Sequence, residues 1–206
     1  MADLTVLAFE LADKYRNPAI VLADGFIGQM MEPIELEYHE VRLPERPWAV
    51  QGTPETRKNL ISSIYLETDA LEEHVRKLEA KYIRASQIEA RHETLQTEDA
   101  EVLLVGYGIT SRVLRSAVEM ARREGLKAGL FRPITLWPFP AKALVEAANK
   151  VNRVLVVELS NGQMVEDVRL ALNGKVPVEF YGRTGGNVPS VEEVHSQLMQ
   201  HVMALI

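Results

Sequence analysis

This sequence of 206 residues contains no cysteine. Disulfide bonds, a thiolate nucleophile, thiolate-ligated zinc and cysteine-bound iron–sulfur clusters are therefore all excluded for this chain. If the chain works in a redox system, another polypeptide has to carry the electron-transfer groups. The five histidines are scattered, and His195 and His201, six residues apart, do not fall on one helical face. No metal site is predicted from them.

Long apolar runs, a basic block and an export signal are also absent. The apolar stretches are under ten residues and are broken by glycine or charge, which is too short to span a membrane. The formal net charge is -6, and lysine and arginine do not cluster into a basic face, which argues against nucleic acid. Residues 1–4 do not begin a basic region followed by an apolar core. Cytoplasm is the expected location, with neither membrane nor nucleic acid as a partner.

Short β-branched runs alternate with helical intervals in the second half of the chain. The runs are residues 102–105, 127–131, 154–157 and 178–181. Continuous apolar runs of this length, separated by helices, are typical of parallel strands covered on both faces. We therefore predict a three-layer α/β/α domain with a mostly parallel sheet over residues 99–206.

The carboxyl edge of this sheet is the predicted working surface, because ligands usually bind outside the carboxyl ends of parallel strands. Gly106-Tyr107-Gly108 follows a strand and opens a helix, as a dinucleotide fingerprint requires. However, Ser111 replaces the third glycine, and the next strand runs into Phe131-Arg132-Pro133 without an acidic residue to hold a ribose. A tight strand-to-helix turn is the favoured interpretation, although the N–H groups at the helix start could attract an anion.

The other candidates at this edge are charged or amide side chains that follow the later strands: Arg132, Glu158, Asn161 and Arg183. Glu158 could cap the following helix or form an ion pair with Arg132 or Arg183, and catalysis by Glu158 alone is less expected. Arg183 lies in the glycine-rich segment 182–187. It could hold a phosphate or carboxylate, or hydrogen-bond the carbonyl groups of its own loop.

Residues 1–37 predict a helix over 4–16 with Asp3 as its N-cap, then a short buried strand over 19–23. Asp24, Gly25, Gly28 and Gln29 follow as a candidate ligand or subunit-interface loop, in which the glycines permit a sharp turn. A lone strand cannot bury both of its faces. We therefore expect this segment to be the severed edge of a further α/β domain.

Residues 38–98 predict a connector that contains one long amphipathic helix over 69–93. Its candidate interface residues recur at alternating steps of four and three, close to the 3.5-residue spacing of a coiled-coil seam; they are Leu71, Val75, Leu78 and Tyr82. Two alternatives stay open. The favoured one is a connector helix packed on its own protein, and the other is a docking helix for a partner subunit.

Several strings of the sequence resemble the alpha subunit of 2-oxoacid:ferredoxin oxidoreductases, and the 2-oxoisovalerate and 2-oxoglutarate enzymes are the most similar. Residues 12–18 and 24–33 resemble the end of that family's pyrimidine-binding domain. Residues 105–108, 132–140 and 157–163 are similar to the domain that follows it, which has the transketolase C-terminal fold. The resemblance thus implies that residues 1–37 are a helix-strand remnant of the first domain.

The resemblance implies a reaction of the EC 1.2.7 class for the assembled enzyme. Thiamine diphosphate with Mg attacks a 2-oxo acid, carbon dioxide leaves, iron–sulfur clusters pass electrons to ferredoxin, and coenzyme A accepts the acyl group. The family's alpha subunit has a much longer amino-terminal part, which contains the carboxylate that activates the cofactor. No residue of this sequence matches that carboxylate, so no catalytic residue is assigned.

We therefore expect the C-terminal portion of such an alpha subunit, with a structural and assembly role and no activity alone. Its expected partners are beta, gamma and delta type subunits, with ferredoxin contacted indirectly, and the cofactors are expected on other parts of the assembly. Two alternatives remain. One is a stand-alone assembly module that forms a homodimer or recruits a partner, and the other is a small nucleotide-binding regulator that uses Gly106–Gly108.

Overall fold

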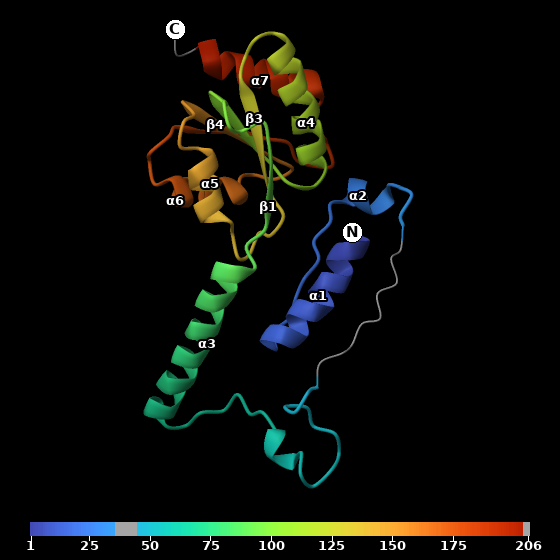
Figure 1. Ribbon diagram of the computed structural model, residues 1–206, viewed down its shortest axis with the longest axis vertical. Coiled ribbons are helices and arrows are strands. Elements are labelled where there is room, and N and C mark those ends of the chain that lie inside the picture. Colours follow the sequence, from blue (N-terminus) through green and yellow to red (C-terminus); the bar gives the residue numbers. More distant parts are fainter. Residues whose placement is uncertain (36–44, 204–206) are drawn as a thin grey trace. The chain divides into compact units, whose positions relative to one another are not determined.

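The computed structural model describes residues 1–35 and 45–203. The chain divides into two compact units, and Figure 1 shows its helices and strands. The first unit consists of Met1–Met30 together with Ile83–Ile206, and the second consists of Met31–Tyr82. The predicted working surface lies in the first unit, which contains the sheet.

The sheet of the first unit has five strands in the order β1-β3-β2-β4-β5. The strands are β1 (His92–Leu95), β2 (Val102–Val105), β3 (Ala128–Pro133), β4 (Arg153–Glu158) and β5 (Val178–Gly182). Strands β2 to β5 pair in parallel, whereas β1 pairs antiparallel with β3. Every residue of β2 and of β4 is buried, as expected for central strands with helices on both faces.

Four helices cover the two faces of the sheet. α4 (Gly108–Arg123) and α7 (Val191–Met203) pack on one face, where Leu114 and Leu198 join Leu104 in one core cluster. α5 (Ala141–Ala147) and α6 (Met164–Leu172) pack on the other, where Leu144 and Val168 share a second core cluster with Leu103. The layers are visible in Figure 1. The predicted three-layer, mostly parallel α/β class is confirmed.

The predicted end of the long helix is wrong, because the sheet begins earlier than the sequence suggested. α3 spans Thr68–Ile88 and does not reach residue 93. The backbone carbonyl of Arg91 accepts hydrogen bonds from the N–H groups of Ile134 and Thr135, so the chain leaves the helix to join β3. β1 then follows as a polar edge strand with a mostly exposed side-chain pattern. A polar strand of this kind gives no apolar run to detect.

The amino-terminal segment differs from its prediction in three ways. α1 spans Ala2–Tyr15 with Met1 at its N-cap, so Asp3 lies in the first turn. Residues 19–23 form neither a helix nor a strand, and they pair with no strand among the described residues. Gly25 and Gly28 belong to a short helix, α2 (Gly25–Gln29), and neither has a positive φ, so the predicted glycine turn is wrong. The reason is local, since the Asp24 side chain accepts a hydrogen bond from the Ile27 N–H and starts a helix.

The second unit contains most of α3 and the 3-10 turn Arg57–Asn59. The side-chain amide of Asn59 donates to the carbonyl groups of Pro47 and Ala49 at 2.7 and 3.0 Å. The ring of Tyr65 stacks on His74. Three of the four candidate interface residues on α3, Leu71, Val75 and Tyr82, are exposed, and Leu78 is half-buried. A docking role for this helix stays a prediction.

Candidate functional site at the carboxyl edge of the sheet

The parallel strands bring the predicted edge residues together at one end of the sheet. Gly106 and Gly108 follow β2, and Glu158 closes the neighbouring strand β4. The register pairs Val105 with Val156, so the two strands end at nearly the same level. Arg183 follows β5, which pairs with β4 up to Glu158 opposite Gly182. The topology therefore brings the predicted residues to one edge of the sheet. What this edge can bind depends on the contacts of each side chain.

Glu158 is a fully buried carboxylate that caps α6. One oxygen accepts the Val165 N–H at 2.9 Å, and the other accepts the Met164 N–H at 3.0 Å and the Ser160 hydroxyl at 2.8 Å. A buried charge is tolerated when donors of this kind surround it, and the positive end of a helix dipole adds to the stabilisation. Of the alternatives for Glu158, capping is confirmed. The ion pair with Arg132 or Arg183 is not found within the described residues.

The charge of Glu158 affects its neighbours. Burial, and then the charge of Glu158, raises the pKa of Asp167 in the first turn of α6. Burial also raises the pKa of Tyr107, with smaller contributions from Glu158 and Asp24. Both shifts favour the neutral form of the side chain, as is usual for groups beside a buried carboxylate. Glu158 thus contributes, after burial, to the raised pKa of both neighbouring side chains.

Asn161 lies at the turn between Glu158 and α6. Its side chain is exposed. The following residue, Gly162, has a φ of 100° and donates its N–H to the Ser160 hydroxyl at 3.3 Å. A Cβ at this glycine would lie 3.0 Å from Val165 Cγ1. The turn is thus shaped for the cap of α6, and a ligand-binding role for Asn161 stays a prediction.

The turn Gly106-Tyr107-Gly108 needs each of its glycines for a different reason. A Cβ on Gly106 would lie 2.6 Å from Leu114 Cδ1 and 3.2 Å from the Val157 carbonyl oxygen. Gly108 has a φ of 60°, which side-chain-bearing residues rarely adopt. The glycines therefore allow a close approach between strand and helix, and the predicted tight turn is confirmed.

The N-terminus of α4 is occupied by Asp24. Its Oδ2 accepts the Ile109 N–H at 2.8 Å, and its Oδ1 accepts the Ile27 N–H at 2.8 Å. Sequence reasoning missed this contact between residues 85 positions apart. The detectable signal was an aspartate in an N-cap position before residues 25–29, which predicts the local cap but not the distant one. The anion position that the sequence suggested is thus filled by a carboxylate of the same chain.

Both candidate arginines pair with carboxylates of the chain. Arg132 Nη1 lies 2.8 Å from Glu93 Oε2, across the pair of strands β3 and β1. Arg183 Nη1 lies 2.6 Å from Glu193 Oε1. Hydrogen bonding to Tyr181, together with the charge of Glu193, raises the pKa of Arg183.

The partner of Arg183 is itself part of a capping box at the start of α7. The Ser190 N–H donates to Glu193 Oε2 at 2.8 Å, and the Glu193 N–H donates to the Ser190 hydroxyl at 3.1 Å. Arg183 therefore ties the end of β5 to the start of α7. Among the described residues its guanidinium pairs with Glu193, and the predicted binding of a phosphate or carboxylate ligand by Arg183 stays a prediction.

The remaining candidates lie on α2. Gly25, Gly28 and Gln29 are exposed there, beside the half-buried Asp24. Their exposure is compatible with the predicted place in a subunit interface. It stays a prediction.

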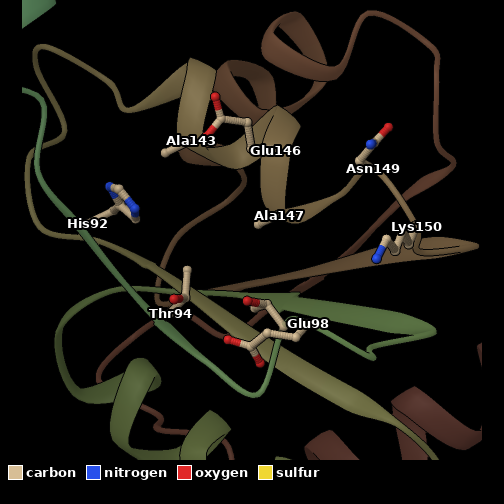
Figure 2. Close-up of a pocket in the computed structure, with 9 residues that line it drawn as sticks. His92, Thr94, Glu98, Ala143, Glu146, Ala147, Asn149 and Lys150 are labelled. Atoms are coloured by element: carbon tan, nitrogen blue, oxygen red, sulfur yellow. The ribbon is translucent and has the colours of Figure 1, made fainter.

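A separate hollow of about 290 Å³ lies between β1 and α5 (Figure 2). His92 and Thr94 of β1 face Ala143, Glu146 and Ala147 of α5 across it. The ring of His92 stacks on Phe131 at 5.2 Å between centroids, which gives this histidine a packing role. The charged groups around the hollow have mixed signs and are exposed to solvent. They do not converge on one point that could bind a ligand of one charge.

Two further features are absent from the part of the chain that the structure describes. No group of three or more His, Asp or Glu side chains there is arranged to hold a metal ion. No helix within residues 1–35 or 45–203 combines the length and apolar character needed to cross a bilayer.

Comparison with known proteins gives a consistent result. Residues 100–194 match the family described as pyruvate:ferredoxin oxidoreductase core domain II. The chain is 49% identical over 201 residues to the ketoisovalerate oxidoreductase subunit VorB of Methanothermobacter thermautotrophicus, a match that covers 97% of this chain and 57% of that protein. It is 31% identical over 224 residues to the 2-oxoglutarate synthase subunit KorA of Methanothermobacter marburgensis, covering 96% and 60%.

Among solved structures, the 2-oxoglutarate:ferredoxin oxidoreductase from Magnetococcus marinus is similar in fold. The TM-score is 0.64 at 23% identity, over 75% of this chain and 28% of that chain. The chain spans 57% and 60% of the two curated relatives named above. Together these similarities confirm the resemblance that the sequence strings indicated.

Proposed function

We propose that this chain, a homologue of subunits of the 2-oxoacid oxidoreductases, is a non-catalytic structural part of a thiamine diphosphate-dependent 2-oxoacid:ferredoxin oxidoreductase. In that assembly the enzyme converts a 2-oxo acid, coenzyme A and oxidised ferredoxin into acyl-CoA, carbon dioxide and reduced ferredoxin. The name of the more similar relative favours 2-oxoisovalerate as the substrate. This chain contributes a folded surface for assembly.

We infer that the residues of this chain do not hold the iron–sulfur clusters or the diphosphate of such an enzyme. Iron–sulfur clusters need thiolate ligands as a rule, and the chain has no cysteine. A diphosphate needs free N–H donors or cations, whereas the Ile109 N–H is bound to Asp24 and both arginines of the edge are paired. We therefore place thiamine diphosphate, Mg, the clusters and coenzyme A on other parts of the assembly.

The observation that carries the assembly role is the apolar surface of residues 1–30. α1 has no buried residue among its 14, although it carries leucine, valine and phenylalanine side chains. Phe9 is 75% exposed, and Ile20 and Leu22 in the stretch between α1 and α2 are 79% and 70% exposed. Exposed apolar surface of this kind marks a protein–protein contact. The matching surface belongs to another part of the oxidoreductase.

An activity assay tests the catalytic half of this proposal. The isolated chain is incubated with a 2-oxo acid, coenzyme A, thiamine diphosphate, Mg²⁺ and an artificial electron-accepting dye. We expect no dye reduction above the rate without protein. A robust substrate-dependent rate would show that the chain carries catalytic groups of its own.

Reconstitution tests the assembly half. The chain is mixed with the other subunits of a 2-oxoisovalerate oxidoreductase, and complex formation is followed by size-exclusion chromatography. We expect the double variant Ile20→Asp, Leu22→Asp to lose association, because it places two charges in the apolar contact. Leu170→Asp is the matched control, since Leu170 is equally exposed, at 79%, on the outer side of α6. Equal retention of both variants in the complex would contradict the proposed contact surface.

A stand-alone assembly module is the second candidate function. The exposed seam of α3 favours it, because Leu71 and Val75 lie on one stripe with 44% and 51% of their surface exposed. A nucleotide-binding regulator has no comparable support, since the N-terminus of α4 is taken by Asp24.

A further inference from the structure

One carboxylate serves the starts of two helices that are far apart in the sequence. The first N–H groups of a helix have no partner within the helix and carry a partial positive charge. Asp24 Oδ1 accepts such a group from α2, the Ile27 N–H, and Oδ2 accepts one from α4, the Ile109 N–H, each at 2.8 Å. α2 also contacts α4. The half-buried Asp24 therefore connects the amino-terminal segment directly to the α/β domain.

The α4 side of this contact is shaped to admit a carboxylate oxygen. A Cβ on Gly108 would lie 2.5 Å from Asp24 Oδ2, closer than real Cβ atoms come to an oxygen. The φ of 60° at Gly108 turns the backbone so that the Ile109 N–H faces the incoming side chain. A larger residue at this position would therefore both strain the turn and displace the carboxylate.

A second anchor holds the other end of the same segment. Glu89, buried to 4% exposure after the end of α3, accepts hydrogen bonds from Lys14 Nζ at 2.6 Å and from the Tyr15 hydroxyl at 2.8 Å through one oxygen. Arg91 Nη2 contacts its other oxygen at 3.2 Å. The chain is thus attached at Lys14–Tyr15 and again at Asp24. The exposed stretch 16–23 lies between the two attachment points.

We propose that Gly106-Tyr107-Gly108, at the start of α4, is a docking port for a carboxylate and that Asp24 is its intramolecular ligand. Asp24 clamps the amino-terminal segment onto the α/β domain, and with Glu89 it fixes both ends of residues 16–23. The port explains why this turn resembles a nucleotide-binding loop and yet has its N–H donor occupied. The clamp is a property of the chain itself, whatever assembly the chain joins.

Hydrogen–deuterium exchange of the full chain tests the clamp. Asp24→Asn keeps the shape of the side chain but has one carbonyl oxygen for two N–H donors, so one donor loses its partner. We expect the amides of Ile27 and Ile109, and the peptide covering residues 17–31, to exchange about tenfold faster or more than in the wild-type protein. Asp3→Asn is the matched control, because it removes the same charge from the same segment, and it should exchange as the wild type does.

A pair of glycine variants tests the port from the other side. Gly108→Ala puts a methyl group against the carboxylate, whereas Gly125→Ala introduces a side chain at a φ of 92° with nothing within 4 Å of its Cβ. Both variants strain a left-handed position, but only the first one should release residues 17–31. The amides of β2 and β4 report in every variant that the domain remains folded.

Specific outcomes overturn the proposal. Suppose that Ile109 and residues 17–31 exchange at the wild-type rate in Asp24→Asn while β2 and β4 stay protected. That result would show that the carboxylate does not hold the segment. Equal release of the segment by Gly108→Ala and Gly125→Ala would show that backbone strain, and not the port, is responsible. If Asp24→Asn unfolds the domain, the glycine pair decides the question alone. Loss of activity or of subunit binding plays no part in this test, so it stands apart from the proposed function.

Discussion

The buried carboxylate of Glu158 provides the sharpest test of how this fold is held together. It accepts three hydrogen bonds, from the Met164 and Val165 N–H groups and from the Ser160 hydroxyl. Each hydrogen bond to a charged group contributes about 1.5–3 kcal/mol. These contributions are not additive, since all three donors share one side chain. We expect Glu158→Ala to reduce the free energy of unfolding by about 3–4 kcal/mol, because two N–H groups at the start of α6 lose their partner.

A conservative variant separates the charge from the packing. Glu158→Gln keeps the side-chain volume and one acceptor oxygen. Its amide NH2 group, however, replaces the other acceptor and points its own N–H groups toward hydrogen-bond donors of the protein. We expect it to cost about half as much as the alanine variant, roughly 2 kcal/mol. Glu166→Gln is the matched control on the same helix, because Glu166 is exposed and forms a surface pair with Arg169. Its expected effect is within about 0.5 kcal/mol.

Urea unfolding followed by far-ultraviolet circular dichroism measures all three variants. The comparison uses the unfolding midpoint and slope, so that a change in stability is distinguished from a change in the surface exposed on unfolding. If Glu158→Ala and Glu158→Gln both unfold within about 0.5 kcal/mol of the Glu166→Gln control, the reasoning is wrong. The hydrogen bonds at the start of α6 would then contribute nothing net to the fold.

Three further predictions concern acid stability, nucleotides and self-association. The hydrogen bond from Lys14 holds the pKa of Glu89 below its ordinary value of 4.5. Its contribution to stability is therefore present above that pH and is lost as the pH falls through the lowered value. Glu89→Gln should lose less stability than the wild type between about pH 5 and pH 3 in thermal melts, and parallel losses would refute this. Calorimetric titration with NAD, ATP or coenzyme A should give no saturable heat, because Asp24 occupies the Ile109 N–H; a saturable isotherm would restore the nucleotide-regulator hypothesis. Light scattering should give a mass near 23.1 kDa for the isolated chain and for the triple variant Leu71→Asp, Val75→Asp, Leu78→Asp. Twice that mass, reduced to the single value in the triple variant, would instead support the stand-alone assembly module.

The sequence by itself determined the α/β domain. The runs at 102–105 and 154–157 coincide with β2 and nearly with β4, because strands covered on both faces must be apolar throughout. The helix predicted between the first two strands corresponds to α4, with Gly125 just beyond its end at a positive φ. These features depend on the pattern of neighbouring residues, so they can be recognised without knowing the contacts.

Only the tertiary structure decided which residues complete the edge. β1 is too polar to stand out, and it becomes a strand because β3 offers it an open edge. The choice of Glu158 between a cap and an ion pair depended on where the start of α6 came to lie. The contact of Asp24 with Ile109 joins residues 85 positions apart. Short-range patterns carry no information about such pairs, since the partner of a polar side chain is set by the path of the whole chain.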